Sequence, residues 1–453
     1  MKIIIVLAVL CLFTLLFRIA AGTLDIKKLN IISYAYYNIL IFSFIGASLV
    51  FLGFRDHYLI ADIKSEAVIH KTYLFLCYAI IVFPATVILC NFLLNGRKIR
   101  KQYEKQLQTG AAYRNGEKAV FIFSAAMAVI GISATIYMFI CIGSVPILHL
   151  NQTSEELARI SSQVNRNFAG NTYIKNIVVL TFVPLFSYLT YVYWRTSRKI
   201  QWGMLFFIFF ITSILVKTHD LSKAPVIYYA FHFIVIEVIL NNRKLFRYLF
   251  AFGALGLICI FLQYKYIMGY NTNFFTIRSG PGGRIFMTQI ATLFLHIQAF
   301  PEQIPYLNGA SLPTVLAKLA GVPDSWVRSG REVMKLYNPA AVSNGTAGSM
   351  NAFFIGEAYA NWGTAGALAA PVIIGIHFSV AFTLLLKMKK TPLSIMLYIA
   401  LFQMLTGALQ GGFIDYLYNV GIILTIGLIY GISVLISRGK LGVRKPLRWK
   451  RIQ

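Results

Sequence analysis

The stretch AVFIFSAAMAVIGISATIYMFICIG, residues 119–143, decides the fold class of this chain. It carries no charged side chain and is longer than the roughly 20 apolar residues that an α-helix needs to cross a bilayer. Similar runs recur along all 453 residues, of which 58% are hydrophobic and only 13% charged, against about 25% charged in soluble proteins. The sequence therefore predicts an all-α, polytopic integral membrane helical bundle that forms a single domain, 1–453.

We expect about eleven membrane-spanning helices. They are 3–21, 31–54, 72–94, 119–143, 175–194, 202–217, 225–240, 248–268, 363–386, 394–412 and 416–437. A twelfth candidate is RIFMTQIATLFLHIQAF, 284–300, whose Thr, Gln and His residues favour an interfacial or re-entrant helix. Residues 3–21 look like the apolar part of a signal peptide, but the many spans that follow favour an uncleaved first helix.

The net charge of +27 is a signal of topology. More than half of the 42 Lys and Arg residues fall in alternate predicted loops, which are 23–30, 95–118, 195–201, 241–247, 387–390 and the tail 437–453. By the positive-inside rule these loops are cytoplasmic. The C-terminus is then inside and, with eleven spans, the N-terminus is outside. Because the location of the charge is explained by topology, no nucleic acid is expected as a partner.

Two long segments are expected on the outer side, 144–174 and 269–362. Loops of this length are uncommon unless they are functional or disordered. The second segment is rich in Tyr, Phe, Trp and Met and contains short amphipathic pieces, so an ordered cap of short helices is the natural interpretation.

The turn KTHDLSKAP, 217–225, lies between two short predicted spans. A helix of 16 residues is about 24 Å long, against about 30 Å for the hydrocarbon core, so the turn is expected in a recess below the outer surface. It carries Lys217, His219, Asp220 and Lys223, and Lys265 in QYKYIMGY ends a later span on the same side. Charged groups at that depth are costly and are functional by default. The alternative is an Asp220–Lys223 pair that only stabilises the turn.

The stretch IRSGPGGR, 277–284, places Arg278 and Arg284 around a Gly-rich turn. Such a turn can expose backbone N–H groups, and two guanidinium groups can hold phosphate oxygens in a bidentate way. A plain turn with flanking arginines is an equally good interpretation.

The stretch FFIGEAYANWGTAG, 353–366, places an acid inside an apolar context. Glu357 and Asn361 are four residues apart and share a helical face. Glu357 can pair with the arginines, orient a sugar hydroxyl or act as a base; pairing is the favoured role. Tyr359 and Trp362 are typical of the interface belt. The candidates for contacting a sugar acceptor are Tyr359, Asn361, Arg328 and Arg331.

Other chemistry has little support in the sequence. The five Cys and seven His residues are scattered, and there is no acidic cluster, no His pair at helical spacing and no nucleotide-binding motif. We therefore expect no metal site and no cofactor.

Three stretches give the chain a resemblance to a known family. SKAP (222–225), QYKYIMGY (263–270) and IGEAYANWG (355–363) resemble segments of the Wzy-type polymerases of O-antigen, also called oligosaccharide repeat unit polymerases. The topology, with its short mid-chain hairpin and large late external loop, is also similar. One departure is Lys223, which stands where the family frequently has Arg. The fold would then resemble the lipid-donor membrane glycosyltransferases of the GT-C type.

The resemblance implies a polymerase in the bacterial cytoplasmic (inner) membrane with its active site facing the periplasm. The nascent glycan would move from undecaprenyl pyrophosphate onto the next lipid-linked repeat unit, without metal. Glu357, His219 and Asp220 would be catalytic, and the donor pyrophosphate would meet Lys217, Lys223, Lys265, Arg278 and Arg284. Its partners would be the undecaprenyl-pyrophosphate-linked oligosaccharide, membrane lipids and a chain-length regulator protein.

Two other classes of function stay open. An O-antigen ligase uses the same donor but transfers the glycan to the lipid A core. A transporter or flippase of polyisoprenoid-linked sugars is the non-enzymatic alternative; inverted repeats would support it, and the sequence shows no such symmetry.

Overall fold

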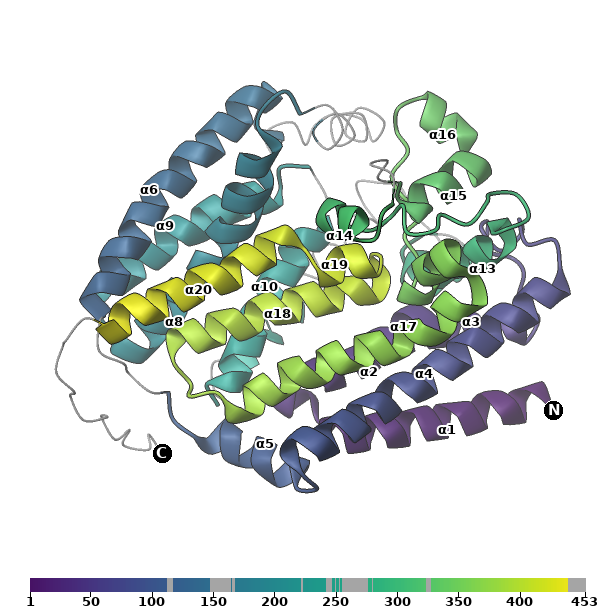
Figure 1. Ribbon diagram of the computed structural model, residues 1–453, viewed down its shortest axis with the longest axis horizontal. Coiled ribbons are helices and arrows are strands. Elements are labelled where there is room, and N and C mark those ends of the chain that lie inside the picture. Colours follow the sequence, from purple (N-terminus) through teal and green to yellow (C-terminus); the bar gives the residue numbers. More distant parts are fainter. Residues whose placement is uncertain are drawn as a thin grey trace. The chain divides into compact units, whose positions relative to one another are not determined.

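The structure is a computed structural model, shown in Figure 1. It describes residues 1–111, 117–146, 164, 168–220, 223–241, 247–248, 250–251, 253–254, 276–278, 280–322 and 327–438. Every regular element in this described part of the chain is helical, and no strand occurs in it. The all-α expectation is therefore confirmed for these residues.

Within the described ranges, eight helical segments are long and apolar enough to cross a membrane. They are α1 (Lys2–Ala21), the continuous α2 (Ile31–Ile39), η2 (Leu40–Phe44) and α3 (Ile45–Phe51), α4 (Glu66–Asn95), α6 (Glu117–Ile142), the continuous η4 (Ile174–Phe182) and α8 (Val183–Ser197), α9 (Ile200–Lys217), α17 (Phe354–Lys387) and α18 (Pro392–Gln410). Two further helices have shorter apolar stretches, α10 (Lys223–Ile239) and α20 (Val420–Arg438). The chain is a multi-pass helical membrane protein.

These helices correspond to ten of the spans expected from the sequence. The largest differences are at two helix starts. The helix α4 begins at Glu66, before the expected residue 72, and α17 begins at Phe354, before the expected residue 363. The expected span 248–268 lies largely outside the described residues. The total of eleven or twelve spans therefore stays a prediction.

The remaining helices are short. They are η1 (Ile26–Lys28), α5 (Ile99–Gln108), α12 (Gly280–Gly283), η5 (Arg284–Thr288), α13 (Gln289–Ala299), α14 (Thr314–Leu319), α15 (Ser329–Tyr337), α16 (Pro339–Ser343) and α19 (Ile414–Leu417). The chain divides into two compact units, which we describe separately. The first unit comprises 1–103, 254–386 and 402–419, and the second comprises 104–253, 387–401 and 420–453.

Aromatic side chains form much of the core between the early helices of the first unit. Phe13 of α1 stacks on Tyr36 of α2 with ring centroids 4.9 Å apart, and Phe17 meets Phe83 of α4 edge-on at 5.4 Å. Such pairs contribute about 0.5–1.5 kcal/mol beyond the area they bury. They hold α1, α2 and α4 together.

We call the stretch 280–361 of the first unit the cap, and it contains most of the short helices of that unit. Its helix α13 falls in the segment 284–300, which the sequence predicted as interfacial or re-entrant. In the structure every residue from Ile290 to Ala299 is buried, and α13 packs against α4 and α15. Protein surrounds this helix, which explains how it accommodates Thr292, His296 and Gln298.

The second unit is built around α6, α8 and α9, with α10 packed on α8 and α9. Its interior contains a charged pair, in which Arg195 Nε lies 3.1 Å from Glu237 Oε1. The Tyr191 hydroxyl donates to the same oxygen at 2.6 Å. Because an ionised group inside a membrane bundle is costly unless it is paired, this trio stabilises the packing of α8 on α10.

Candidate functional site

The segment around Glu357 forms a short helix that ends where α17 breaks. Trp362 (φ −133°, ψ 20°) and Gly363 (φ 58°, ψ −143°) leave helical geometry, so α17 consists of a short first part, 354–361, and a long membrane part. All residues of the first part are buried. A Cβ at Gly363 would stand 2.9 Å from the Tyr306 ring. Glycine is therefore needed there both for its positive φ and for the close approach of Tyr306.

Asn361 fastens the loop 307–311 to this short helix. Its side-chain amide donates to Ser311 Oγ at 2.7 Å and to the Glu357 carbonyl at 2.9 Å. Its Oδ1 accepts from the Gly309 N–H at 3.0 Å. An amide has two donors and two acceptor lone pairs, so only one lone pair is left for a ligand. The structure thus gives Asn361 a structural role; the acceptor contact predicted from the sequence remains a prediction.

Replacing Asn361 by alanine should destabilise the cap. The change removes three hydrogen bonds, among them those that Asn361 makes with the Gly309 N–H and the Ser311 hydroxyl. We therefore expect the unfolding free energy to fall by about 2–3 kcal/mol. Thermal unfolding of the purified protein measures this loss. Asn344→Ala, at an exposed position of the same cap, is the matched control. Equal stability of the two variants would show that Asn361 is not a clamp.

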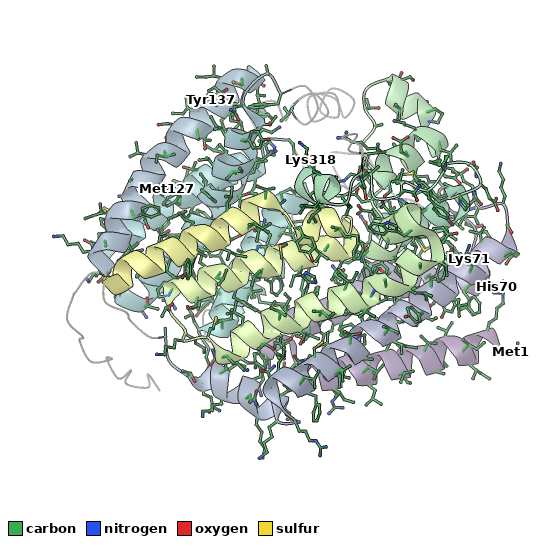
Figure 2. The ribbon with its side chains drawn as sticks, viewed as in Figure 1. Met1, His70, Lys71, Met127, Tyr137 and Lys318 are labelled. Carbon is green, nitrogen blue, oxygen red and sulfur yellow. The ribbon has the colours of Figure 1, made fainter. Side chains whose placement is uncertain are left out.

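Tyr359 lies inside the protein. It is 1% exposed, and its hydroxyl accepts a 2.7 Å hydrogen bond from Lys71 Nζ. The same ammonium stands 4.9 Å from the centre of the Tyr359 ring. Figure 2 labels Lys71 near the beginning of α4. Loss of solvent and a hydrogen bond with Tyr359 raise the pKa of Tyr306 to about 12, so this phenol stays neutral.

Glu357 is buried in the same short helix, with 4% of its surface exposed. Its neighbour Gly356 lies close against α13, because a Cβ there would stand 3.3 Å from Leu293 and 3.4 Å from His296. An ionised carboxylate out of water costs several kcal/mol unless other groups compensate it. Glu357 does interact with the protein around it. A buried acid with partners is compatible with the predicted pairing role.

A cavity of about 270 Å³ lies in the first unit. It is lined by Tyr58, Leu59, Asp62, Thr288, Gln289, Thr292, Met334, Tyr337, Asn338, Ser349, Met350 and Asn351. Thr292 Oγ1 donates to the Asn351 carbonyl at 2.7 Å, which ties one wall to the chain just before the Glu357 helix. The Ser349 hydroxyl is buried and hydrogen-bonds to no described residue. Hydroxyl, amide and phenol groups with a single acid suit a neutral polar ligand such as a sugar.

This cavity was not predicted from the sequence. Its walls come from three stretches that are far apart in the chain, 58–62, 288–292 and 334–351. None of these stretches has a recognisable motif.

Two histidines of the first unit are buried, His57 in the loop before α4 and His296 in α13 of the cap. The Nδ1 of His57 accepts from the Leu59 N–H at 3.3 Å, and His296 Nδ1 donates to the Thr292 carbonyl at 2.7 Å. Burial lowers the pKa of each to about 4. Both imidazoles are therefore neutral at pH 7.

Lowering the pH should destabilise this region by protonating His57 and His296 before the carboxylates are protonated. Each of these histidines has a pKa of 6.5 in the unfolded chain and about 4 in the folded protein. Its contribution to the free energy of unfolding is therefore complete above pH 6.5 and falls as the pH drops toward 4. The loss is on the order of 3 kcal/mol per residue. We expect unfolding temperatures to fall over this range, and the His57→Asn variant to show a shallower fall because Asn keeps an acceptor and cannot be protonated. An identical slope in wild type and variant would contradict this.

Three of the predicted arginines of the first unit are exposed, and the fourth, Arg328, is half-buried. Arg278 is 70% exposed in its side chain, and its Nε is 3.8 Å from a carboxylate oxygen of Asp56. Arg284 begins η5 and is exposed. The Arg328 guanidinium lies 5.5 Å from the centre of the Tyr416 ring, and Arg331 is exposed in α15. Their predicted contacts with pyrophosphate and sugar stay predictions.

The second unit holds the other predicted cluster. Lys217 Nζ donates to the Leu180 carbonyl at 3.2 Å, and His219 Nδ1 lies 4.0 Å from Asp220 Oδ1. Neither ring nitrogen of His219 hydrogen-bonds to a residue that the structure describes, and burial lowers its pKa. Lys223 begins α10, and Lys265 lies outside the described residues. The structure thus brings Lys217, His219 and Asp220 together at one turn.

Across the described ranges, no three His, Cys, Asp or Glu side chains are grouped as they would be around a metal ion. Comparison with protein families, with curated proteins and with solved structures finds no match for this chain. A functional assignment must therefore come from the site.

Proposed function

We propose that this protein is an oligosaccharide repeat unit polymerase. It transfers a nascent glycan from undecaprenyl pyrophosphate onto the next lipid-linked repeat unit, at the periplasmic face of the bacterial cytoplasmic membrane. The observation that supports this most is the short helix 354–361, which buries Glu357 and is clamped in a cap beside a polar cavity. This helix contains most of the segment IGEAYANWG that resembles the polymerase family.

The cavity suits the acceptor. Ligand pockets usually measure roughly 300–1,000 Å³, so about 270 Å³ fits the end of a glycan better than a whole repeat unit. Tyr58 and Tyr337 offer flat apolar faces with polar rims, and the unpartnered Ser349 hydroxyl offers a hydrogen bond. The terminal sugar of the acceptor is the part that must be held still during transfer.

The reaction is a displacement at the anomeric carbon of the donor. The acceptor hydroxyl oxygen forms the new glycosidic bond, the bond to the pyrophosphate oxygen breaks, and undecaprenyl pyrophosphate leaves with the electron pair. The hydroxyl proton passes to a base. We assign Glu357 to holding the site cations or, second, to taking this proton. We assign Arg278 and Arg284 of the first unit to the leaving pyrophosphate, where fixed positive charge lowers the barrier.

A test uses the purified protein and synthetic lipid-linked repeat units. Polymerase activity should give a ladder of products spaced by one repeat unit, and the Glu357→Gln variant made in parallel should give about a hundredfold less of it. Addition of lipid A core as the acceptor distinguishes a ligase, which would modify the core and give no ladder. Transbilayer movement of the labelled substrate without new bonds would identify a transporter and contradict the proposal.

Replacing Tyr58 by alanine should weaken acceptor binding. The side chain is 59% exposed at the cavity, so folding should change little. We expect the KM for the acceptor to rise about fivefold, which is about 1 kcal/mol, with kcat retained. Tyr173→Ala removes a similarly exposed tyrosine (72%) of the second unit and is the control. Equal KM values for both variants would place the acceptor elsewhere.

A further inference from the structure

A second cavity, of about 470 Å³, lies between α1 and α4 at the end where α5 begins. Figure 1 shows α1 and α4 side by side with α5 at their common end. The end of α1 packs tightly against the start of α5. Gly22 ends α1 with a φ of 73°, and a Cβ there would stand 3.1 Å from Arg100 Cα. Asn91 of α4 donates to the Ala20 carbonyl of α1 at 3.3 Å. The groove is therefore a fixed feature of the packed helices.

Three arginines line this groove, Arg18, Arg97 and Arg100. All three residues are exposed, and none of the described residues that line the groove is Asp or Glu. Arg97 lies 5.5 Å from the Phe92 ring, which fixes one guanidinium over an apolar wall. A groove lined by three arginines attracts an anion. The predicted topology assigns this end to the cytoplasmic side, where loops are basic.

The rest of the groove is apolar and open to the surface. Leu15 and Ile19 of α1 are 54% and 52% exposed, and Phe92 of α4 is 47% exposed. On a membrane helix such residues face acyl chains. The groove thus combines a cationic end with an apolar wall, as an anionic lipid requires and a free phosphate does not.

We propose that this groove binds one anionic glycerophospholipid. Its phosphodiester lies among Arg18, Arg97 and Arg100, and an acyl chain lies along Leu15, Ile19 and Phe92. Basic pockets between membrane helices on the cytoplasmic side recognise lipid headgroups in this way. The site does not depend on the proposed glycosyl transfer and lies among different residues.

The test is native mass spectrometry of the detergent-purified full chain with phosphatidylglycerol or phosphatidylcholine of identical acyl chains. Wild type should bind phosphatidylglycerol at least about tenfold more tightly. R18Q/R97Q/R100Q should lose this preference. The control K27Q/K98Q/K101Q removes equal charge from exposed residues of the same region that do not line the groove, and it should keep the preference. Thermal unfolding in phosphatidylcholine reports folding, and the single variant R97Q should show a partial loss if the triple variant is unstable.

The Leu15→Trp variant separates a lipid from a free phosphate. It fills the apolar wall at an exposed position, so phosphatidylglycerol binding should weaken while the arginines stay intact. Competition by inorganic phosphate at the concentration of the lipid would show a simple anion site and overturn the proposal. Equal losses in the arginine and lysine triple variants, or no lipid preference in wild type, would also overturn it.

Discussion

The Glu357→Gln variant should make about a hundredfold less polymer than wild type while its amount in the membrane stays normal. The substitution keeps the volume of the buried side chain and deletes its charge. If Glu357 holds the cations of the site in place, its loss should cost about 3 kcal/mol of transition-state stabilisation, similar to removing one oxyanion donor. Chain-length profiles scaled to the membrane protein level measure this effect.

The Glu357→Asp variant separates the two assigned roles. A partner for cations should retain part of the activity, because the charge survives with a shorter reach. A general base should fail, since proton transfer needs the oxygen within about 3 Å of the acceptor hydroxyl. Glu332→Gln is the control, because Glu332 pairs with Lys335 at 2.7 Å on α15 and does not line the cavity. Normal chains from Glu357→Gln would rule out a charged role.

The Gly363→Ala variant should lose about 4 kcal/mol of unfolding free energy. The backbone at φ 58° and ψ −143° costs a residue with a side chain about 1–3 kcal/mol, and the new Cβ would stand 2.9 Å from the Tyr306 ring and force it to move. Thermal unfolding measures the loss. Gly348→Ala is the control, because it has no positive φ and no atom within 4 Å of the added Cβ, and it should change stability by less than about 0.5 kcal/mol. Similar unfolding temperatures for both variants would contradict the described break in α17.

The membrane helices were predictable because hydropathy alone determines them. The run 119–143 and the helix α6 coincide within two residues at either end. The expected span 363–386 even began at the break, because Glu357, Asn361 and Gly363 interrupt an otherwise apolar stretch. The burial of α13 was not predictable, since its polar residues find partners in other parts of the chain, such as the Asn351 carbonyl that accepts from Thr292.

The candidate site was predictable only where one residue contrasted with its surroundings. An acid in an apolar run singled out Glu357, which the structure buries, and its role stays a prediction. The tie between Lys71 and Tyr359 joins residues 288 positions apart, and no local pattern encodes it. The cavity could not be predicted from the sequence for the same reason, because Tyr58, Thr292 and Asn351 come together only through tertiary packing.

The most direct test of the proposed function counts the leaving group. Purified protein is incubated with lipid-linked repeat units, and released undecaprenyl pyrophosphate is measured beside the new glycosidic bonds. We expect one undecaprenyl pyrophosphate to be released for each bond formed, in a ladder that the Glu357→Gln variant makes about a hundredfold less of. Release of the carrier without chain growth, or no release while substrate crosses the bilayer, would contradict it.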